Sequence, residues 1–95
     1  MSTIASSLIS LDPAPGEEPT SVELEREMGF MEQSIRRTIR SVDILTRYGK
    51  HEFLVILVGT GAEGAKTSVD RIFRDYFKIS GNSVYMPSYI ISEMD

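Results

Sequence analysis

A short hairpin pattern lies between two helical patterns, and it restricts the fold of this chain more than any other feature. Residues 40–57 read RSVDILTRYGKHEFLVIL, which predicts a strand from Ile44 to Tyr48, a turn at Gly49-Lys50 and a more apolar strand from His51 to Val58. Glycine at the first turn position is typical of a type II′ hairpin, because that position needs a positive φ and glycine adopts it without a Cβ clash. The sequence therefore predicts an antiparallel hairpin with Gly49 and Lys50 at its tip.

An amphipathic helix is expected on each side of this hairpin. Thr20 and Glu23 fit a capping box, which predicts that the first helix begins there. Its apolar stripe has steps of three and four residues, at Leu24, Met28, Met31, Ile35, Ile39 and Val42. The second helix is expected to end near Phe77-Lys78, before a turn at residues 80–83, and its stripe is Ala62, Ala65, Val69, Ile72 and Tyr76.

Two further strands complete the pattern. The first, Ile4 to Leu11, ends at Asp12-Pro13, and the last runs from Val84 to Ile91. Pro87 cannot donate a ladder hydrogen bond, which favours an edge position for the last strand. The order βαββαβ is that of the α+β ferredoxin-like fold, and right-handed crossovers give a four-stranded antiparallel sheet of order 4-1-3-2 with two helices on one face. We expect a single domain over residues 1–95, with its core at about 4–91.

Composition and charge exclude several classes of protein. The 95 residues include no cysteine, so there is no disulfide framework, and no apolar run is long enough for a membrane span. The net charge of −4 argues against DNA or RNA as a partner, and a cytoplasmic location is expected. Charge is uneven, because residues 1–35 hold seven acids and one base, whereas residues 36–50 hold five bases and one acid.

Residues 40–53 resemble the hairpin of GGDEF domains, the diguanylate cyclase family of bacterial signalling proteins. The match consists of Arg40-x-x-Asp43, then Arg47-Tyr48, and then the five-residue motif, which reads Gly49, Lys50, His51, Glu52 and Phe53. It extends over about residues 4–91 and lacks the leading helix and much of the loop after the first strand. The resemblance implies the same βαββαβ core that the periodicity predicts.

The resemblance also implies which residues cyclase chemistry needs. In active members, an Asp after the first strand and an acid at the third motif position hold metal ions, and Asp12 matches the first of these. Ala14 replaces the next Asp, Lys50 fills the second glycine position, and His51 stands where the acid belongs. Mg²⁺ prefers oxygen ligands, so we expect a degenerate site with no catalytic residue and no cofactor. Mg²⁺ would be a cofactor only if the protein kept residual cyclase activity. Asp12 and Glu52 are then the vestigial candidates for metal ligands.

For two other residues, Glu25 and His51, the alternative to a functional role is an ordinary exposed side chain. Glu25 falls near the substrate-recognising acid of the family, but an acid on a helix is usually a solvated residue. His51 is the only histidine in the chain. A lone histidine at a hairpin tip is most often an exposed residue without a role, and a part in ligand or partner binding is the alternative.

A second implied site is regulatory. In the family, Arg-x-x-Asp before the motif forms the inhibitory site for cyclic di-GMP together with an Arg on the following helix. Arg40, Asp43 and Arg71 match these positions. A guanidinium can donate two hydrogen bonds to O6 and N7 of guanine. The alternative is a local ion pair between Arg40 and Asp43 at the end of the first helix.

Three functions remain open from the sequence. The first is a catalytically inactive GGDEF-like module that binds cyclic di-GMP or a partner signalling domain. The second is a structural or homodimerising domain without nucleotide, with an apolar patch around Phe30, Phe73 and Tyr89. The third is a residual diguanylate cyclase.

Overall fold

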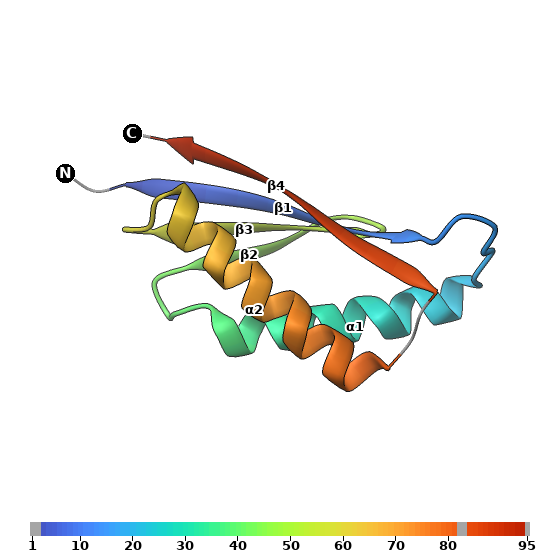
Figure 1. Ribbon diagram of the computed structural model, residues 1–95. Coiled ribbons are helices and arrows are strands. Elements are labelled where there is room, and N and C mark those ends of the chain that lie inside the picture. Colours follow the sequence, from blue (N-terminus) through green and yellow to red (C-terminus); the bar gives the residue numbers. More distant parts are fainter. Residues whose placement is uncertain (1–2, 82–83, 95) are drawn as a thin grey trace.

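The computed structural model describes residues 3–81 and 84–94, and its elements alternate as the sequence predicts (Figure 1). They are β1 (Ile4–Pro13), α1 (Ser21–Thr38), β2 (Ile44–Gly49), β3 (Glu52–Val58), α2 (Ala62–Ser80) and β4 (Tyr85–Met94). All neighbouring strands are antiparallel in one sheet of order β2-β3-β1-β4, and both helices cover the same face of it. The predicted ferredoxin-like fold is confirmed.

The core lies between the helices and the inner face of the sheet. Alternate residues of the two central strands point into it, because successive side chains of a strand point to opposite faces. β1 contributes Ala5, Ile9 and Leu11, and β3 contributes Phe53, Val55 and Leu57. The helices bury most residues of their predicted stripes against this surface, namely Met28, Met31, Ile35, Ala65, Val69, Ile72 and Tyr76. Ala62 was also assigned to a stripe, but it lies at the start of α2 and is exposed.

Helix α1 begins as expected and ends earlier than its stripe predicts. Thr20 caps it, because its hydroxyl accepts a hydrogen bond from the backbone N–H of Glu23 at 3.1 Å. Ile39 is already extended, and the chain turns away after it. Val42 is therefore 59% exposed, so its assignment to the buried stripe is wrong.

Helix α2 continues three residues beyond Phe77 to Ser80. It ends at Gly81, whose φ of 64° is the left-handed conformation that glycine adopts readily at a helix end. The predicted turn after the helix includes Asn82 and Ser83, which lie outside the described residues.

The hairpin between β2 and β3 is present, but its turn differs from the predicted one. Gly49 is the last residue of β2 and pairs with Glu52, so Lys50 and His51 form the turn. Positive φ values occur in the described chain at Gly16, Gly59 and Gly81, and not at Gly49, so the type II′ assignment is wrong. The register shifts between Arg47 and Gly49, which marks a bulge at Tyr48. A bulge adds local twist, and the strands can then close without a turn of positive φ.

The edge position predicted for the last strand is confirmed, because β4 pairs only with β1 and Pro87 faces Leu11. The predicted apolar patch is wrong. Phe30, Phe73 and Tyr89 are partly buried against the core, and the rings of Phe73 and Tyr89 meet edge to face at 5.8 Å. No described helix is long and apolar enough to cross a membrane.

Candidate functional site

The segment between α1 and β2 is a tight turn closed by its own aspartate. The backbone N–H of Asp43 donates to the carbonyl of Arg40 at 3.0 Å. The carboxylate of Asp43 folds back in turn, and its Oδ2 accepts the backbone N–H of Arg40 at 2.8 Å. This pair of bonds fixes the chain direction between the end of the helix and the start of the hairpin.

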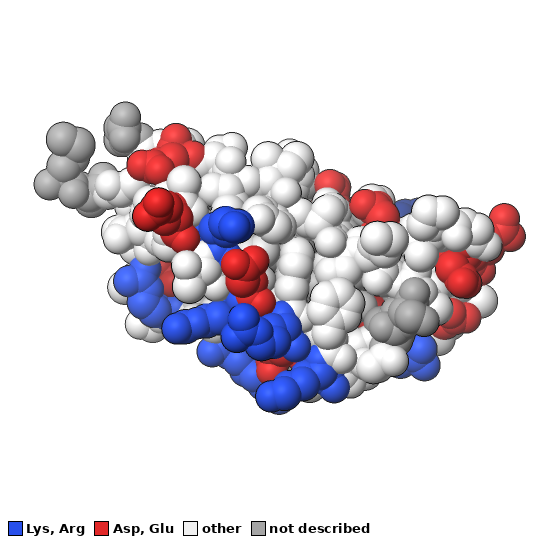
Figure 2. Space-filling model, in the orientation of Figure 1, with Lys and Arg blue, Asp and Glu red and all other residues white. Residues whose placement is uncertain are grey.

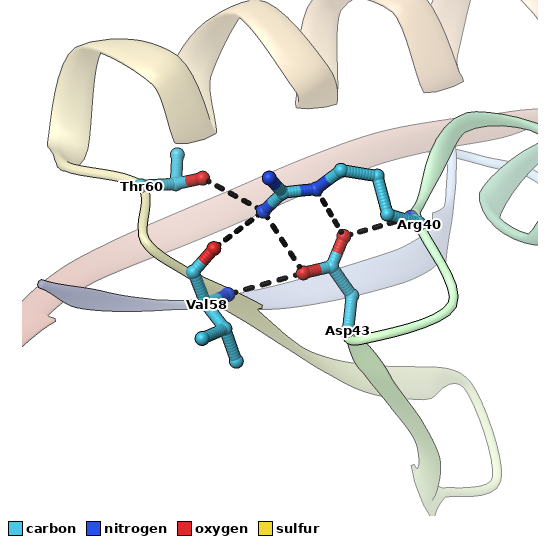
Figure 3. Close-up of polar contacts among 4 residues, drawn as sticks. All are labelled: Arg40, Asp43, Val58 and Thr60. Carbon is cyan, nitrogen blue, oxygen red and sulfur yellow. Dashed lines mark hydrogen bonds and ion pairs between the residues drawn. The ribbon is translucent and has the colours of Figure 1, made fainter. Parts of the chain in front are cut away.

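The side chains of the same two residues also meet (Figure 3). Nε of Arg40 lies 3.3 Å from Oδ2 of Asp43, and Nη2 lies 3.2 Å from Oδ1, which is a two-point contact. Nη2 also donates to the carbonyl of Val58 and to the hydroxyl of Thr60. Oδ1 of Asp43 accepts the backbone N–H of Val58 at 3.1 Å. We call these four residues the Arg40–Asp43 clasp, because they join the start of β2 to the end of β3 and to the loop before α2.

The two side chains of the clasp differ in exposure. The side chain of Asp43 is 1% exposed, whereas that of Arg40 is 56% exposed. Burial alone would raise the pKa of Asp43, but the backbone N–H groups of Arg40 and Val58 and the Arg40 guanidinium together lower it below its ordinary 3.8. Asp43 is therefore a buried anion whose oxygens are already engaged.

Arg40 keeps part of its hydrogen-bonding capacity. Its Nη1 atom has no partner in the described part of the chain, so two N–H donors of a half-exposed guanidinium remain available (Figure 3). Arg40 and Asp43 also line a pocket of about 350 Å³ that opens beside the end of α1. The remaining lining residues are Arg36, Ile39, Ser41 and Leu45.

The third predicted ligand residue is not part of this group. Arg71 is exposed on the middle of α2, and it does not line the pocket. One turn further along α2, Asp75 forms a 3.5 Å ion pair with Arg37 of α1. The structure thus brings Arg40 and Asp43 together and leaves Arg71 outside the pocket.

Basic side chains nevertheless gather on this part of the surface. Figure 2 shows Lys and Arg over the helix layer at the end where α1 finishes, with acids beside them and further acids at the opposite end. Arg36 and Arg37 occupy the last turn of α1, where the helix dipole favours cations. Two of these cations, Arg36 and Arg40, line the pocket beside the clasp.

The degenerate motif lies at the tip of the hairpin, next to the end of β1. The Nδ1 atom of His51 is buried and lies 3.2 Å from Oδ1 of Asp12, without the geometry of a hydrogen bond. The backbone N–H of Leu11 donates to the carbonyl of His51 at 2.8 Å, which holds the two segments together. Asp12 and the third motif position are therefore neighbours, as the resemblance implies.

The remaining motif residues are positioned by the sheet. Glu52 points away from the helices and accepts the Ser10 hydroxyl at 3.4 Å, whereas Phe53 is buried in the core. A Cβ at Gly49 would lie 3.2 Å from Oε1 of Glu52, so this position is already tight. Residues 3–81 and 84–94 contain no group of three His, Cys, Asp or Glu residues placed to hold a metal ion.

A contact that the sequence did not predict holds the hairpin tip to α1. Nη2 of Arg47 lies 2.7 Å from Oε1 of Glu25, and the same guanidinium donates to the carbonyls of Gly49 and Lys50. The hydrogen bond and the charge of Arg47 lower the pKa of Glu25 from its ordinary 4.5. The signal available in the sequence was Arg47 itself. This cation lies beyond the end of α1, so the dipole of that helix does not explain it.

Comparison with known proteins identifies the fold. No family model and no curated protein matches the sequence. Solved structures do match, and three of them illustrate the likeness. The active GGEEF domain of a diguanylate cyclase from Vibrio cholerae has a TM-score of 0.75 at 14% identity, and 98% of this chain covers 63% of that one.

The other two are of the same kind. A DGC protein from Thermotoga maritima has a TM-score of 0.74 at 16% identity, with 97% of this chain covering 64% of that chain. The GGDEF domain of DgcB from Caulobacter crescentus, in complex with c-di-GMP, has a TM-score of 0.73 at 15% identity, with coverages of 99% and 61%. The chain thus has the fold of GGDEF domains and spans less than two thirds of the length of these structures.

Proposed function

We propose that this chain is a GGDEF-like signalling module that binds cyclic di-GMP through Arg40 and does not make it. The observation that carries the proposal is the state of Arg40. Asp43 holds this guanidinium at two points beside a 350 Å³ pocket, and Nη1 is left without a partner among the described residues. A fixed, half-exposed arginine loses less conformational entropy on binding a guanine or a phosphate than a mobile one does.

We infer different tasks for the three predicted ligand residues. Asp43 accepts four hydrogen bonds within the clasp and is 1% exposed, so it positions Arg40 and is not itself offered to a ligand. Arg40 would make the direct contact. Arg71 lies outside the pocket, and it would contribute through its charge or after a change of rotamer.

The loss of catalysis is supported by the hairpin tip. Phosphoryl chemistry on GTP needs hard oxygen ligands for metal ions and backbone that can approach the phosphates closely. Lys50 adds a long side chain at the tip, and His51 occupies the third motif position with its ring beside Asp12. Glu52 is hydrogen-bonded to Ser10. Both vestigial metal candidates therefore contact other side chains: Asp12 lies next to His51, and Glu52 accepts a hydrogen bond from Ser10.

Isothermal titration of the protein with cyclic di-GMP tests the proposal. We expect saturable heat for the wild type, no heat for Arg40→Ala, and weaker binding for Arg71→Ala. Arg47→Ala is the matched control, because it removes an arginine of similar exposure at the other end of the hairpin and should bind as the wild type does. Equal heats for Arg40→Ala and the wild type, or no heat from either, would contradict the ligand assignment.

The same preparation incubated with GTP and Mg²⁺ or Mn²⁺ tests the absence of catalysis. We expect no cyclic dinucleotide above the level of a protein-free control. Formation of cyclic di-GMP would refute that part of the proposal and would leave the titration result unaffected.

A further inference from the structure

Two arginines, Arg36 and Arg37, are adjacent in the last turn of α1, but they contact different parts of the molecule. Nη1 of Arg37 lies 3.5 Å from each carboxylate oxygen of Asp75 on α2. Arg36 instead lines the pocket beside the Arg40–Asp43 clasp, which Arg37 does not. The dipole of α1 favours a cation at either position. It therefore accounts for two arginines at this helix end, and not for the placement of Arg36 on the wall of the pocket.

The guanidinium of Arg36 is held at one atom only. Its Nε donates to Oε2 of Glu32, one turn earlier in α1, at 3.0 Å. Neither Nη1 nor Nη2 of Arg36 has a partner within residues 3–81 and 84–94, so the N–H donors of both Nη atoms are available. The pair is exposed, with 63% of the Arg36 side chain and 41% of the Glu32 side chain accessible. An exposed pair adds little stability, so a ligand can use the free end of this guanidinium at small cost.

Arg40 has less of its guanidinium left. Asp43 accepts from Nε and Nη2, and Nη2 also donates to Val58 and Thr60, which leaves Nη1. A two-point contact with a phosphate uses two parallel N–H groups of the planar guanidinium fork. Of the residues that line the pocket, Arg36 is the one whose Nη1 and Nη2 are both available for such a contact.

The balance of charge at the pocket leads to the same residue. The charges of Arg40 and the buried Asp43 oppose each other at contact distance, and the carbonyl end of the α1 dipole adds partial negative charge. The clasp alone therefore attracts an anion weakly. Arg36 is a second cation on the pocket wall. Its partner Glu32 does not line the pocket and is 41% exposed, so water screens the charge of that carboxylate.

The pocket also has an apolar wall. Ile39 and Leu45 are half-buried against the core, and both line the pocket. A flat heterocyclic base can lie on such a surface, whereas a phosphate needs donors and positive charge. The pocket therefore combines an apolar surface for a base with a guanidinium fork for a phosphate, and a nucleotide carries both groups.

We propose that Arg36 binds a phosphate group of the ligand through two hydrogen bonds from Nη1 and Nη2. This inference rests on the proposed function, because it assigns a second arginine to the same pocket. It adds to the sequence-predicted residues a cation that already lines the pocket, whereas Arg71 lies outside it.

Isothermal titration with cyclic di-GMP, comparing Arg36→Ala with Arg37→Ala, tests the inference. The two variants are matched, because each removes an exposed arginine, 63% or 60% accessible, from the same helical turn. Arg36→Ala should raise the Kd roughly tenfold or more, since hydrogen bonds between charged groups are lost. Arg37→Ala should bind as the wild type does. Both contacts are exposed, so the urea midpoints of the two variants should stay close to that of the wild type.

A lysine variant and a salt series separate a phosphate contact from a general effect of charge. Arg36→Lys keeps the cation without the fork, and its Kd should lie between those of the wild type and Arg36→Ala. Raising NaCl from about 50 mM to about 500 mM should weaken binding by the wild type more than by Arg36→Ala, because salt screens the lost contact. Arg36→Lys with the affinity of the wild type would overturn the two-point contact. Equal Kd values for Arg36→Ala and Arg37→Ala, or the same salt dependence for Arg36→Ala and the wild type, would overturn the role of Arg36.

The role of Arg36 and the proposed function can fail separately. If the wild type binds, Arg40→Ala does not, and Arg36→Ala binds unchanged, the proposed function stands and the phosphate contact fails. If Arg36→Ala loses affinity while Arg40→Ala does not, the assignment of Arg40 fails and that of Arg36 stands. No heat from the wild type would overturn both.

Discussion

Two arginine–carboxylate contacts lie at opposite ends of the β2–β3 hairpin, and they differ in what surrounds them. In the Arg40–Asp43 clasp the carboxylate is 1% exposed and accepts two backbone N–H groups besides the guanidinium. In the contact between Arg47 and Glu25, the two side chains are 41% and 64% exposed. Both contacts involve residues of the motif that resembles GGDEF domains.

The difference in burial between the two contacts indicates which end of the hairpin is fixed and which end can change conformation. An exposed ion pair gains little free energy, because water screens the charges and two long side chains lose entropy. A buried carboxylate that satisfies backbone donors cannot be removed without leaving those donors unpaired. We infer that the pocket end of the hairpin is the rigid end and that the tip with Lys50 and His51 is the adaptable end.

Among variants at the two ends of the hairpin, Asp43→Ala should have the largest effect on stability. It leaves the N–H groups of Arg40 and Val58 without their acceptor, and we expect a loss of about 2–3 kcal/mol in the free energy of unfolding. Urea denaturation measures it, with an unchanged m-value showing that the unfolded state is the same. Asp43→Asn retains a carbonyl acceptor and should lose less. A loss below about 0.5 kcal/mol for Asp43→Ala would mean that the clasp does not hold the hairpin.

Acid should remove part of the same stabilisation. The pKa of folded Asp43 lies below its ordinary 3.8, so its contribution is complete above the unfolded pKa and is lost as the pH falls through the lower folded value. The stability difference between the wild type and Asp43→Asn should therefore be constant at neutral pH and shrink below about pH 4. A difference that stays constant down to pH 2 would show that the charge of Asp43 is not what matters.

Much of the fold could be predicted from the sequence, because helical and strand periodicity survive without knowledge of tertiary contacts. The stripe from Leu24 to Ile35, the helix start at Thr20 and the edge proline at 87 were each local patterns, and the structure confirms all three. The handedness rule for crossovers then left one strand order, which is the observed one.

The predictions that failed depended on contacts between distant segments. The turn type at Gly49 is set by a bulge at Tyr48, which a type II′ pattern does not contain. The patch at Phe30, Phe73 and Tyr89 is wrong because the faces that α1 and α2 turn towards the sheet and towards each other are wider than a single stripe. In the candidate site, Arg40 and Asp43 were paired correctly because they are three residues apart. The ligand role of Arg71 stays a prediction, because it depends on a spatial relation between α2 and the clasp that sequence spacing does not supply.

The smallest expected effects are at the tip, where they provide the sharpest contrast with the clasp. Glu25→Ala should lower the urea midpoint only slightly at low salt, and 0.5 M NaCl should remove even this difference, because salt screens exposed pairs. Arg47→Ala should cost more than Glu25→Ala, since it also removes the hydrogen bonds to the carbonyls of Gly49 and Lys50 at 3.1 and 3.0 Å. If Glu25→Ala proved as destabilising as Asp43→Ala, both ends of the hairpin would be equally fixed, and the tip could not be the adaptable end.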